Sequence, residues 1–599
     1  MLTPLQEIER RVVSAIAGAM EEAPRPASEA AVTPSQNPQF GDYQSNAAMQ
    51  IAGRLKKERG EKANPRQIAD RIVAAFDGAE LLAEAPAIAG PGFINFTLSP
   101  GWVAARATEA LADERLGVSS AERLERVVVE YSSPNIAKQM HVGHIRSTIL
   151  GDCAARVLEF LGHEVIRQNH VGDWGTQFGM LIENLRDVQA SGDGSSFHIA
   201  DLERFYRDAK KRFDTDPSFA DAARQAVVRL QSGDPDARAA WQTLVAESRA
   251  HFESNYGRMG VGLSVENERG ESFYNARLPS IVEELKAAGV AEESEGAVVS
   301  FAGGFKAPLM IRKSDGGFGY GTTDLAAVEF RARCDDLEWY GRKGLCVDRV
   351  IYFVDARQSQ HFKQVFATAQ AAAEKMDSWR RVREMSLEHA SFGSILGEDG
   401  TPIKTRQGEN VKLADLLDEA EKRARAVVEA QSSELPDDEK AELARAVGIG
   451  AVKYADLSKD RTGDYVFSFD QMLALDGNTA PYLQYAHARI RSIQRKAAEQ
   501  GIDSSTAVAV LAEPAEVALA KHLLGFGDVV RAVARDLKPH MLCTFLYDTA
   551  KRFSAFYENC PVLRSAGEVR SSRLALTELT GRTLSLGLDL LGIAHPERM

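Results

Sequence analysis

The sequence predicts a multidomain α/β protein. A doubly wound parallel-sheet core lies between a small α+β domain at the N-terminus and an all-α domain at the C-terminus. The length of 599 residues leaves room for about four domains. Strand and helix patterns alternate in the middle of the chain, as a parallel sheet requires. A content of 44% hydrophobic and 26% charged residues is typical of globular proteins and excludes extensive disorder.

The first segment, 1–116, predicts the small α+β domain. Helical patterns at 8–20, 46–59 and 66–76 surround short strands, of which GFINFTLS at 92–99 is the clearest. A polar linker at 117–125 follows and separates this domain from the core.

A βαβ unit begins after the linker. Arg126–Glu130, with the sequence RVVVE, is a β-branched run too short for a helix, and we expect a buried parallel strand. Ser133 precedes a proline and is expected to be extended. A helical pattern over 143–161 and a second strand in HEVIRQN at 163–169 complete the unit.

The core is predicted to span 126–410 and to carry an insertion. Long helical periodicity, rich in charge and alanine, indicates a helical insertion at about 183–290. Strand patterns at 298–301, 308–312 and 348–354 predict that the interrupted sheet then resumes. From residue 411 the pattern is almost entirely helical, and we divide it into a connecting region, 411–476, and an all-helical domain, 477–599.

Charge and cysteine content narrow the functional classes. The net charge of −13 argues against general binding to nucleic acid, whereas 482–599 holds 15 Lys and Arg against 12 Asp and Glu and permits a local polyanion-binding face. The five scattered cysteines form no CxxC pair, so we expect neither a disulfide scaffold nor structural zinc. The first residues are charged and amphipathic, so no signal peptide is expected, and no apolar run reaches the ~20 residues of a membrane span. A cytoplasmic protein without membrane contact is expected.

Two histidines form the strongest local feature. His141 and His144 flank Gly143 at the start of the helix that follows the first core strand. The backbone N–H groups and the dipole of a helix N-terminus attract phosphate, and a glycine lets a ligand approach the backbone. Two surface histidines without a ligand are the alternative for an isolated pattern of this kind.

The segment PNIAKQMHVGH at 134–144 resembles the HIGH region of class I aminoacyl-tRNA synthetases, and specifically of arginyl-tRNA synthetases. Six further segments extend the resemblance in order: NHVGDWGTQFGM at 169–180, YGTTDLAA at 320–327, YFVDARQSQHF at 352–362, KTRQGENVKL at 404–413, VKYADLSKDRTGDY at 452–465 and GNTAPYLQYAHARI at 477–490. It implies a Rossmann-type core and two reaction steps. Arginine and ATP form arginyl-adenylate and pyrophosphate, and arginine then passes to the terminal adenosine of tRNA(Arg).

The resemblance also implies the partners. ATP with Mg²⁺, L-arginine and tRNA(Arg) are expected, and arginine activation is expected to need bound tRNA. No zinc, no other metal site and no organic cofactor are expected, and the protein is expected to be a monomer.

The family's arginine site falls on residues able to pair with a buried guanidinium: Glu130, Asn135, Tyr320, Asp324 and Gln358. Tyr320 and Asp324 are four residues apart and share a face if they lie on one helix. The alternative for Asp324 is an N-cap. Three residues of the DWGTQFG segment are expected to line the active site, namely Asp173, Trp174 and Gln177, although Trp174 could equally be a core residue.

The resemblance makes His141, Gly143 and His144 ATP ligands, with the histidines stabilising charge on the α-phosphate. Many class I enzymes hold the pyrophosphate with a KMSKS loop, but this chain has TPIKT at 401–405. The second lysine position is kept as Lys404, Thr401 replaces the first, and Lys138 is placed to compensate. A solvated hairpin with an exposed lysine is the alternative for Lys404.

The C-terminal domain presents a candidate RNA surface. On a helix over 482–497, five apolar residues form a core stripe: Leu483, Ala486, Ile490, Ile493 and Ala497. A second stripe, displaced by one residue, includes Tyr482, Tyr485 and Arg489, which suit unpaired anticodon bases. An amphipathic boundary with snorkelling side chains is the alternative. The N-terminal domain resembles one that contacts the tRNA corner, with Asn95 as its candidate residue.

The alternatives to an active arginyl enzyme are another class I synthetase and an inactive paralogue. A cysteinyl enzyme would need cysteine zinc ligands, which the scattered cysteines of this chain do not supply. A glutamyl enzyme would need a cationic pocket, whereas the matched positions here are the acidic residues Glu130 and Asp324. A catalytically inactive RNA-binding paralogue is less favoured because both histidines, Lys404 and the arginine pattern are kept.

Overall fold

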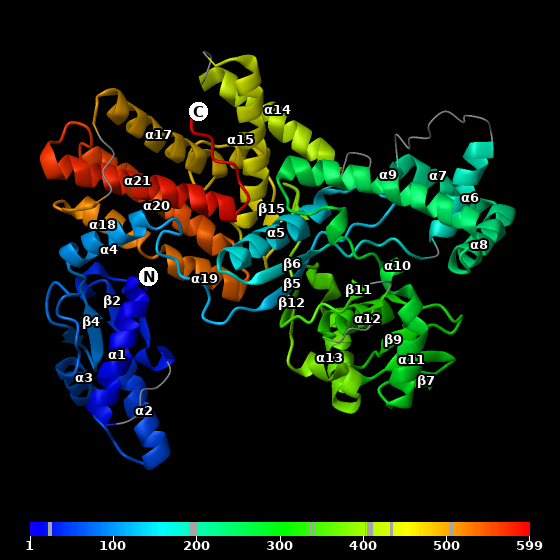
Figure 1. Cartoon of the computed structure of the whole chain (residues 1–599), viewed down its shortest axis with the longest axis horizontal. Coiled ribbons are helices and arrows are strands. Elements are labelled where there is room, and N and C mark those ends of the chain that lie inside the picture. The colour runs from blue at the N-terminus through cyan, green and yellow to red at the C-terminus, as the bar shows by residue number, and fades with distance from the viewer. Residues whose placement is uncertain are drawn as a thin grey trace.

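The computed structural model describes residues 1–21, 27–175, 177–190, 202–334, 338–339, 342–401, 403, 411–431, 435–502 and 507–599. Lys404 and the predicted boundary at residue 410 lie outside the described residues. Figure 1 shows the N-terminal domain below the C-terminal helices, with the parallel sheet in the centre and the helical insertion at the far end.

The N-terminal domain packs helices against an antiparallel sheet of order β1-β2-β4-β3. Its strands are β1 (Val32–Pro34), β2 (Tyr43–Ser45), β3 (Ala87–Ala89) and β4 (Phe93–Phe96), and its helices are α1 (Pro4–Met20), α2 (Ala47–Arg59), α3 (Pro65–Ala74) and α4 (Pro100–Ala112). Thr3 caps α1 by accepting from the Gln6 N–H, and Ile8 and Val12 are buried beneath it. The predicted helices and the strand at 92–99 are confirmed.

The central sheet is parallel, with the order β13-β12-β5-β6. It contains β5 (Arg126–Glu130), β6 (Glu164–Gln168), β12 (Arg349–Tyr352) and β13 (Ser386–His389), while α5 (Ile145–Phe160) and α13 (Ser359–Lys375) make two of the crossovers. Val127, Val128 and Val129 are fully buried, as strands covered on both faces require. The predicted βαβ unit and the strand at 348–354 are confirmed.

The prediction that 298–301 and 308–312 rejoin this sheet is wrong. β8 (Ala297–Ser300) and β9 (Leu309–Arg312) pair antiparallel with each other, and β7 (Glu292–Ser294) pairs with β8 to complete a separate three-stranded sheet. Parallel neighbours need a crossover of a dozen or more residues, whereas these strands follow one another at short intervals. Short apolar runs look alike in both kinds of sheet, so the local pattern could not separate them.

The loop after β5 also departs from prediction, because Ser133 has a φ of +48° rather than an extended value. Ser132 (φ +72°) and Ala137 (φ +62°) are left-handed as well. Three tertiary hydrogen bonds hold this backbone: the N–H of Ser132 donates to Ser147 Oγ, that of Ser133 to Asn169 Oδ1, and that of Ala137 to Ser248 Oγ. Contacts with distant segments therefore override the local preference before proline.

The insertion is helical, as predicted. It contains α6 (Gln177–Ala190), α7 (Leu202–Thr215), α8 (Pro217–Gln231) and α9 (Pro235–Met259), followed by α10 (Glu271–Tyr274) and α11 (Leu278–Ala287). The next helix, α12 (Tyr320–Ala332), packs against the small antiparallel sheet and α13. Two short hairpin strands, β10 (Glu338–Trp339) and β11 (Arg342–Lys343), precede β12.

The region after residue 411 is almost entirely helical, as predicted. It contains α14 (Leu413–Gln431), α15 (Asp437–Leu457), α16 (Phe469–Met472), α17 (Ala480–Glu499), α18 (Pro514–Leu523), α19 (Phe526–Asp536), α20 (His540–Asn559) and α21 (Gly567–Leu590). The exception is β15 (Tyr465–Val466), which pairs in parallel with β14 (Ile395–Leu396) of the core.

A disulfide joins Cys334 and Cys346, which the scattered spacing of the cysteines gave no reason to expect. Cys153, Cys543 and Cys560 are free and buried. Within the described ranges, no helix is long and apolar enough to span a membrane.

Candidate active site

A cleft of about 550 Å³ opens beside the carboxyl ends of β5 and β12. Three stretches that are far apart in sequence form its walls: 132–147, 353–358 and 392–395, together with Ile403. Ligands of open parallel sheets bind at this edge, so the cleft lies where the topology predicts it.

The predicted histidine pair lies in the wall of this cleft. His141 Nδ1 accepts from the Gly143 N–H and His144 Nδ1 accepts from the His141 N–H, both at 3.1 Å, and the ring centroids are 4.0 Å apart. A side chain at Gly143 would come within 2.8 Å of the His141 ring, so this position needs glycine. With both Nδ1 atoms accepting, the neutral rings carry their protons on Nε2.

Electrostatics keep both rings neutral. Burial and the nearby charge of Lys138 lower the pKa of His141. Burial and His141 lower the pKa of His144 to about 3. At neutral pH the pair therefore presents two N–H donors and no charge, an arrangement suited to hydrogen bonds with phosphate oxygens.

Lys138 and the turn before Lys404 lie on separate segments. Lys138 is exposed, and its Nζ lies 4.8 Å from the centroid of the Tyr206 ring on α7. Downstream of β14, the Gly397 N–H donates to the Thr401 carbonyl at 2.7 Å, and Thr401 Oγ1 donates to Asp399. Ile403, which follows this turn, lines the cleft, and Lys404 is the next residue in the sequence.

Among the predicted arginine ligands, Asn135 and Gln358 line the cleft. A Cβ on Gly172 would approach Asn135 Oδ1 to 2.3 Å, so the glycine allows the close pairing of these two chain segments. Gln358 immediately precedes α13, whose first turn also carries His361.

Tyr320 and Asp324 share the first turns of α12, as their spacing predicts. The helix begins at Tyr320 with Gly319 as N-cap, so the N-cap interpretation of Asp324 is wrong. His361 Nε2 lies 2.5 Å from Asp324 Oδ2. Although burial favours the neutral ring, this carboxylate raises the pKa of His361. Tyr320 is 71% exposed and open to a ligand.

Glu130, predicted to bind arginine, has a partner within the protein. Its buried carboxylate is paired with the guanidinium of Arg331 on α12, and Arg331 Nε donates to Gln168 Oε1 at 2.8 Å. Glu130 is absent from the described residues that line the cleft. The partner is 201 residues away in sequence, so no local pattern could have revealed it.

Glu271, at the start of α10, is a candidate that the sequence pattern missed. Burial, followed by the negative charges of Asp173 and Asp324, raises its pKa to about 8. Burial and the charge of Glu271 also raise the pKa of Tyr320. Mutually repelling carboxylates at the edge of a site favour a cationic ligand. Glu271 lies in the segment assigned to the helical insertion, where no motif marked it.

Of the three predicted residues in the DWGTQFG segment, Asp173 contacts the turn that carries Glu271. Asp173 is buried and accepts from Ser272 N–H at 2.8 Å and Ser272 Oγ at 2.6 Å, which holds the turn that carries Glu271. Trp174 is half-buried and meets Trp241 edge to face at 6.2 Å. Gln177 begins α6. None of the three is among the described residues that line the cleft.

On α17 the predicted core stripe is buried throughout, from Leu483 to Ala497. In the second stripe, Tyr485 is 46% exposed, the Tyr482 ring meets Tyr547 edge to face at 5.6 Å, and the Arg489 guanidinium lies 4.7 Å from the Tyr557 centroid. The stripe therefore continues onto α20 as a mixed aromatic and basic surface.

Asn95, in contrast, lies inside the N-terminal sheet. It is 6% exposed and accepts from Gln44 Nε2 at 2.8 Å. A predicted contact with RNA would require an exposed side chain, which this position does not provide.

Three family models match the chain in order. The arginyl-tRNA synthetase N-terminal domain matches 6–98, the catalytic domain of class I tRNA synthetases of the arginine type matches 106–469, and the DALR anticodon-binding domain matches 483–599. The arginine–tRNA ligase of Synechococcus elongatus is 48% identical over 100% of both chains, and that of Laribacter hongkongensis is 49% identical over 98% of both.

Solved structures agree. Plasmodium falciparum arginyl-tRNA synthetase superposes with a TM-score of 0.83 at 30% identity, covering 100% of both chains. The Thermus thermophilus enzyme gives a TM-score of 0.79 at 27% identity, covering 99% of this chain and 100% of that one. As the seven sequence segments predicted, the chain belongs to the arginyl-tRNA synthetases, the class I ligases that join arginine to tRNA with ATP converted to AMP and diphosphate.

Proposed function

We propose how this site divides the work of arginine–tRNA ligation. The cleft around His141 and His144 binds ATP, and the acidic site around Asp324 and Glu271 binds the arginine guanidinium. Asn135 and Gln358, which line the cleft, orient the backbone end of arginine. The single observation that carries the proposal is that Asn135, Gln358 and both histidines line one cleft.

In the first step the arginine carboxylate attacks the α-phosphorus of ATP and pyrophosphate leaves. The protein supplies no nucleophile. The Nε2–H groups of His141 and His144, together with the backbone at Gly143, stabilise the negative charge that develops on the phosphates. Lys138 and Lys404 hold the departing pyrophosphate, with Thr401 in place of the first lysine of the usual loop.

Mg²⁺ accompanies ATP in this proposal. Asp355 is the one carboxylate among the described residues of the cleft wall, and Arg357 binds both of its oxygens. Such a donor set offers no protein cage, in keeping with an ion carried mainly by nucleotide phosphates. In the described part of the chain, no three His, Cys, Asp or Glu side chains come close enough to hold a metal, and the absence of zinc stays a prediction.

Arginine is recognised by charge and shape. Asp324 and Glu271 accept from the planar guanidinium fork, and Tyr320 covers it from the start of α12. Asp173, Trp174 and Gln177 support this wall. Glu130 contributes indirectly, because its pairing with Arg331 fixes α12 against the central sheet.

We divide the chain into four regions, 1–116, 126–410, 411–476 and 477–599, and propose a tRNA contact for three parts of it. The N-terminal domain contacts the tRNA corner, the helical insertion guides the acceptor end, and the helices around Tyr482, Tyr485 and Arg489 bind the anticodon. We further propose that arginine activation needs bound tRNA, and that the protein works as a cytoplasmic monomer.

Asp324→Asn tests the arginine site in ATP–pyrophosphate exchange with tRNA present. A lost charged hydrogen bond should raise the arginine KM by about 10- to 100-fold and leave the ATP KM unchanged. Glu329→Gln on the same helix is the matched control, because Glu329 is buried and pairs with Arg277. A rise in the ATP KM with an unchanged arginine KM would contradict the assignment.

A further inference from the structure

Arg146 is a buried charged residue to which the reaction assigns no role. It follows the histidine pair on α5 and is 1% exposed. Its Nε lies 3.1 Å from Oδ2 of Asp456, a fully buried residue of α15. Its Nη1 donates to the Gly463 carbonyl at 2.9 Å. One side chain thus joins α5, the helix that follows the histidine pair, to the connecting region.

Aromatic and hydroxyl groups complete this junction. The Arg146 guanidinium lies 5.2 Å from the centroid of the Tyr465 ring in β15 and 5.9 Å from that of Phe392. Burial raises the pKa of Asp456, whereas Arg146 and a hydrogen bond from the Tyr465 hydroxyl oppose that shift. Because a buried charge is costly without such partners, the pair tolerates only a narrow set of geometries.

The same junction supports the strand that leads to Lys404. β14 pairs in parallel with β15, with Ile395 opposite Tyr465. The Gly393 N–H donates to the Arg461 carbonyl at 2.9 Å, and a Cβ at Gly393 would come within 2.5 Å of the Gly463 carbonyl. A displacement of the 458–467 segment therefore moves the base of the turn at 397–401.

The 458–467 segment is also tied to the C-terminal helices. Arg461 Nε donates to the Leu537 carbonyl at 2.8 Å, and Lys538 Nζ lies 2.7 Å from Asp460 Oδ2. Leu537 and Lys538 connect α19 to α20. The 458–467 segment thus contacts the C-terminal helices through Asp460 and Arg461. It contacts Arg146, in the wall of the cleft, through Gly463 and Tyr465.

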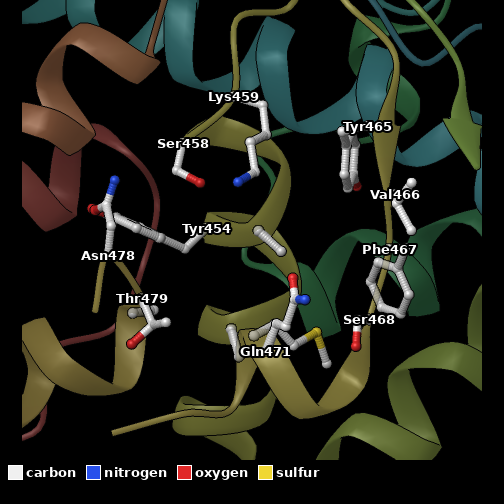
Figure 2. A pocket seen from close by; sticks show the side chains of 14 residues that line it. Tyr454, Ser458, Lys459, Tyr465, Val466, Phe467, Ser468, Gln471, Asn478 and Thr479 are labelled. Atoms are coloured by element: carbon white, nitrogen blue, oxygen red, sulfur yellow. The ribbon is translucent and has the colours of Figure 1, made fainter. Parts of the chain in front are cut away.

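The segment also borders a small hollow. A hollow of about 60 Å³ separates Tyr465 and Phe467 from Tyr454, Ser458 and Lys459. Figure 2 shows Tyr465, Val466 and Phe467 along one stretch of chain, with the Lys459 side chain directed into the space opposite them.

From this arrangement we infer that Arg146 is a positioning residue: paired with Asp456, it transmits the position of the C-terminal helices to α5, directly after the histidine pair, and to the base of the turn at 397–401. The inference rests on the proposed function, in which tRNA bound to those helices is needed for activation. It adds a physical connection between the two sites, made by the 458–467 segment and the Arg146–Asp456 pair.

The test uses the full-length enzyme and the isosteric variant Asp456→Asn, which keeps the volume and removes the charge. The kcat of tRNA-dependent ATP–pyrophosphate exchange should fall by about 3- to 30-fold, the range of couplings carried by such networks. The Kd for tRNA and the KM for arginine should change less than about twofold. Tyr465→Phe should show a smaller loss of the same kind, and Arg146→Lys should retain more activity than Arg146→Ala.

Glu516→Gln is the matched control, because Glu516 and Arg573 form a buried pair wholly within the C-terminal domain. It should lower the melting temperature without lowering kcat. If Asp456→Asn behaved like this control, the positioning role would be overturned.

A double-mutant cycle gives a second, independent readout. Asp456→Asn and Lys538→Ala act at two ends of one connection, so the double variant should lose less than the product of the single losses. Lys521→Ala, which breaks a half-buried ion pair with Asp42 away from the 458–467 segment, is the control that should combine multiplicatively. Multiplicative losses for Asp456→Asn with Lys538→Ala would also overturn the inference. A wild-type enzyme without arginine-dependent exchange would instead refute the proposed function, so the two failures are distinguishable.

Discussion

The two halves of the proposed active site, one for ATP phosphates and one for arginine, are assembled in different ways. The phosphate half comes from one continuous segment, in which His141, Gly143 and His144 hydrogen-bond to one another across at most three residues. The arginine half brings together Glu271 of α10, Asp324 of α12 and His361 of α13, supported by Asp173 before α6. A local motif can be read from sequence, whereas a pocket built from four distant segments appears only once the chain is folded.

The largest expected effect concerns the arginine half. If buried acceptors are arranged around a planar cation with five donors, lysine leaves acceptors unpaired and should be rejected by at least ~10⁴. Canavanine keeps the planar fork and should be charged. Charging of tRNA(Arg) with each amino acid, followed by deacylation of the products, measures both.

If the arginine pocket alone rejects lysine, the helical insertion need not be an editing domain. Hydrolysis of lysyl- or canavanyl-tRNA(Arg) that requires the enzyme, and that disappears when 183–290 is altered, would show that discrimination does not come from the arginine pocket alone.

The phosphate half should respond next in size. Replacing either His141 or His144 by Ala should slow adenylate formation by about 10²- to 10³-fold, because each removes one donor to the transition state. Single-turnover adenylate formation measures the step, and filter binding checks that the tRNA Kd is unchanged. Loss of tRNA binding with an intact chemical step would reverse the assignment of this half.

A pH dependence should distinguish the two halves. The free pKa of Glu271 is raised to about 8, so the residue is mostly protonated at neutral pH and must lose its proton to face a bound guanidinium. Arginine affinity should therefore rise with pH through 8, by about 15-fold between pH 6.5 and pH 8.0 if bound arginine brings the pKa below 6.

Glu271→Gln should abolish most of that dependence when the arginine Kd is measured by calorimetry. Glu268→Gln is the control, because Glu268 lies three residues before Glu271 and pairs with Arg249. This variant should retain the pH dependence of the arginine Kd. The His144 pKa of about 3 predicts no matching effect on ATP affinity over this range. An arginine Kd independent of pH in the wild type would remove Glu271 from the site.

The smallest expected effect lies away from both halves. Tyr485→Ala should weaken tRNA binding by about 5- to 50-fold, the loss of one stacked base, while leaving the chemical step unchanged once tRNA is saturating. Tyr482→Ala should destabilise the helix packing as well, because its ring contacts Tyr547. Equal tRNA affinity in Tyr485→Ala and wild type would favour the amphipathic-boundary interpretation of this stripe.

The sequence by itself determined the helices, the first βαβ unit, the core stripe of α17 and the reaction class. The structural elements depend on residues close together in the chain: a β-branched run for β5 and a 3.6-residue period for α17. The reaction class comes from the family resemblance of seven segments between 134 and 490, of which HVGH has its own internal hydrogen bonds. The backbone geometry and the side-chain period of a helix or strand are set by a few neighbouring residues, so the sequence pattern of those residues predicts the element.

Tertiary structure decided which strands share a sheet, which residue pairs with Glu130, and that Asp173 and Asp324 come near enough to raise the pKa of Glu271. It also held Ser133 at positive φ against the preference of a residue before proline. In every case the decisive partner is remote: Arg331 is 201 residues from Glu130, and Asn169 is 36 residues from Ser133. Burial makes such pairings strong because an unpaired polar group in the interior is costly, and burial is a property of the folded chain and not of any one segment.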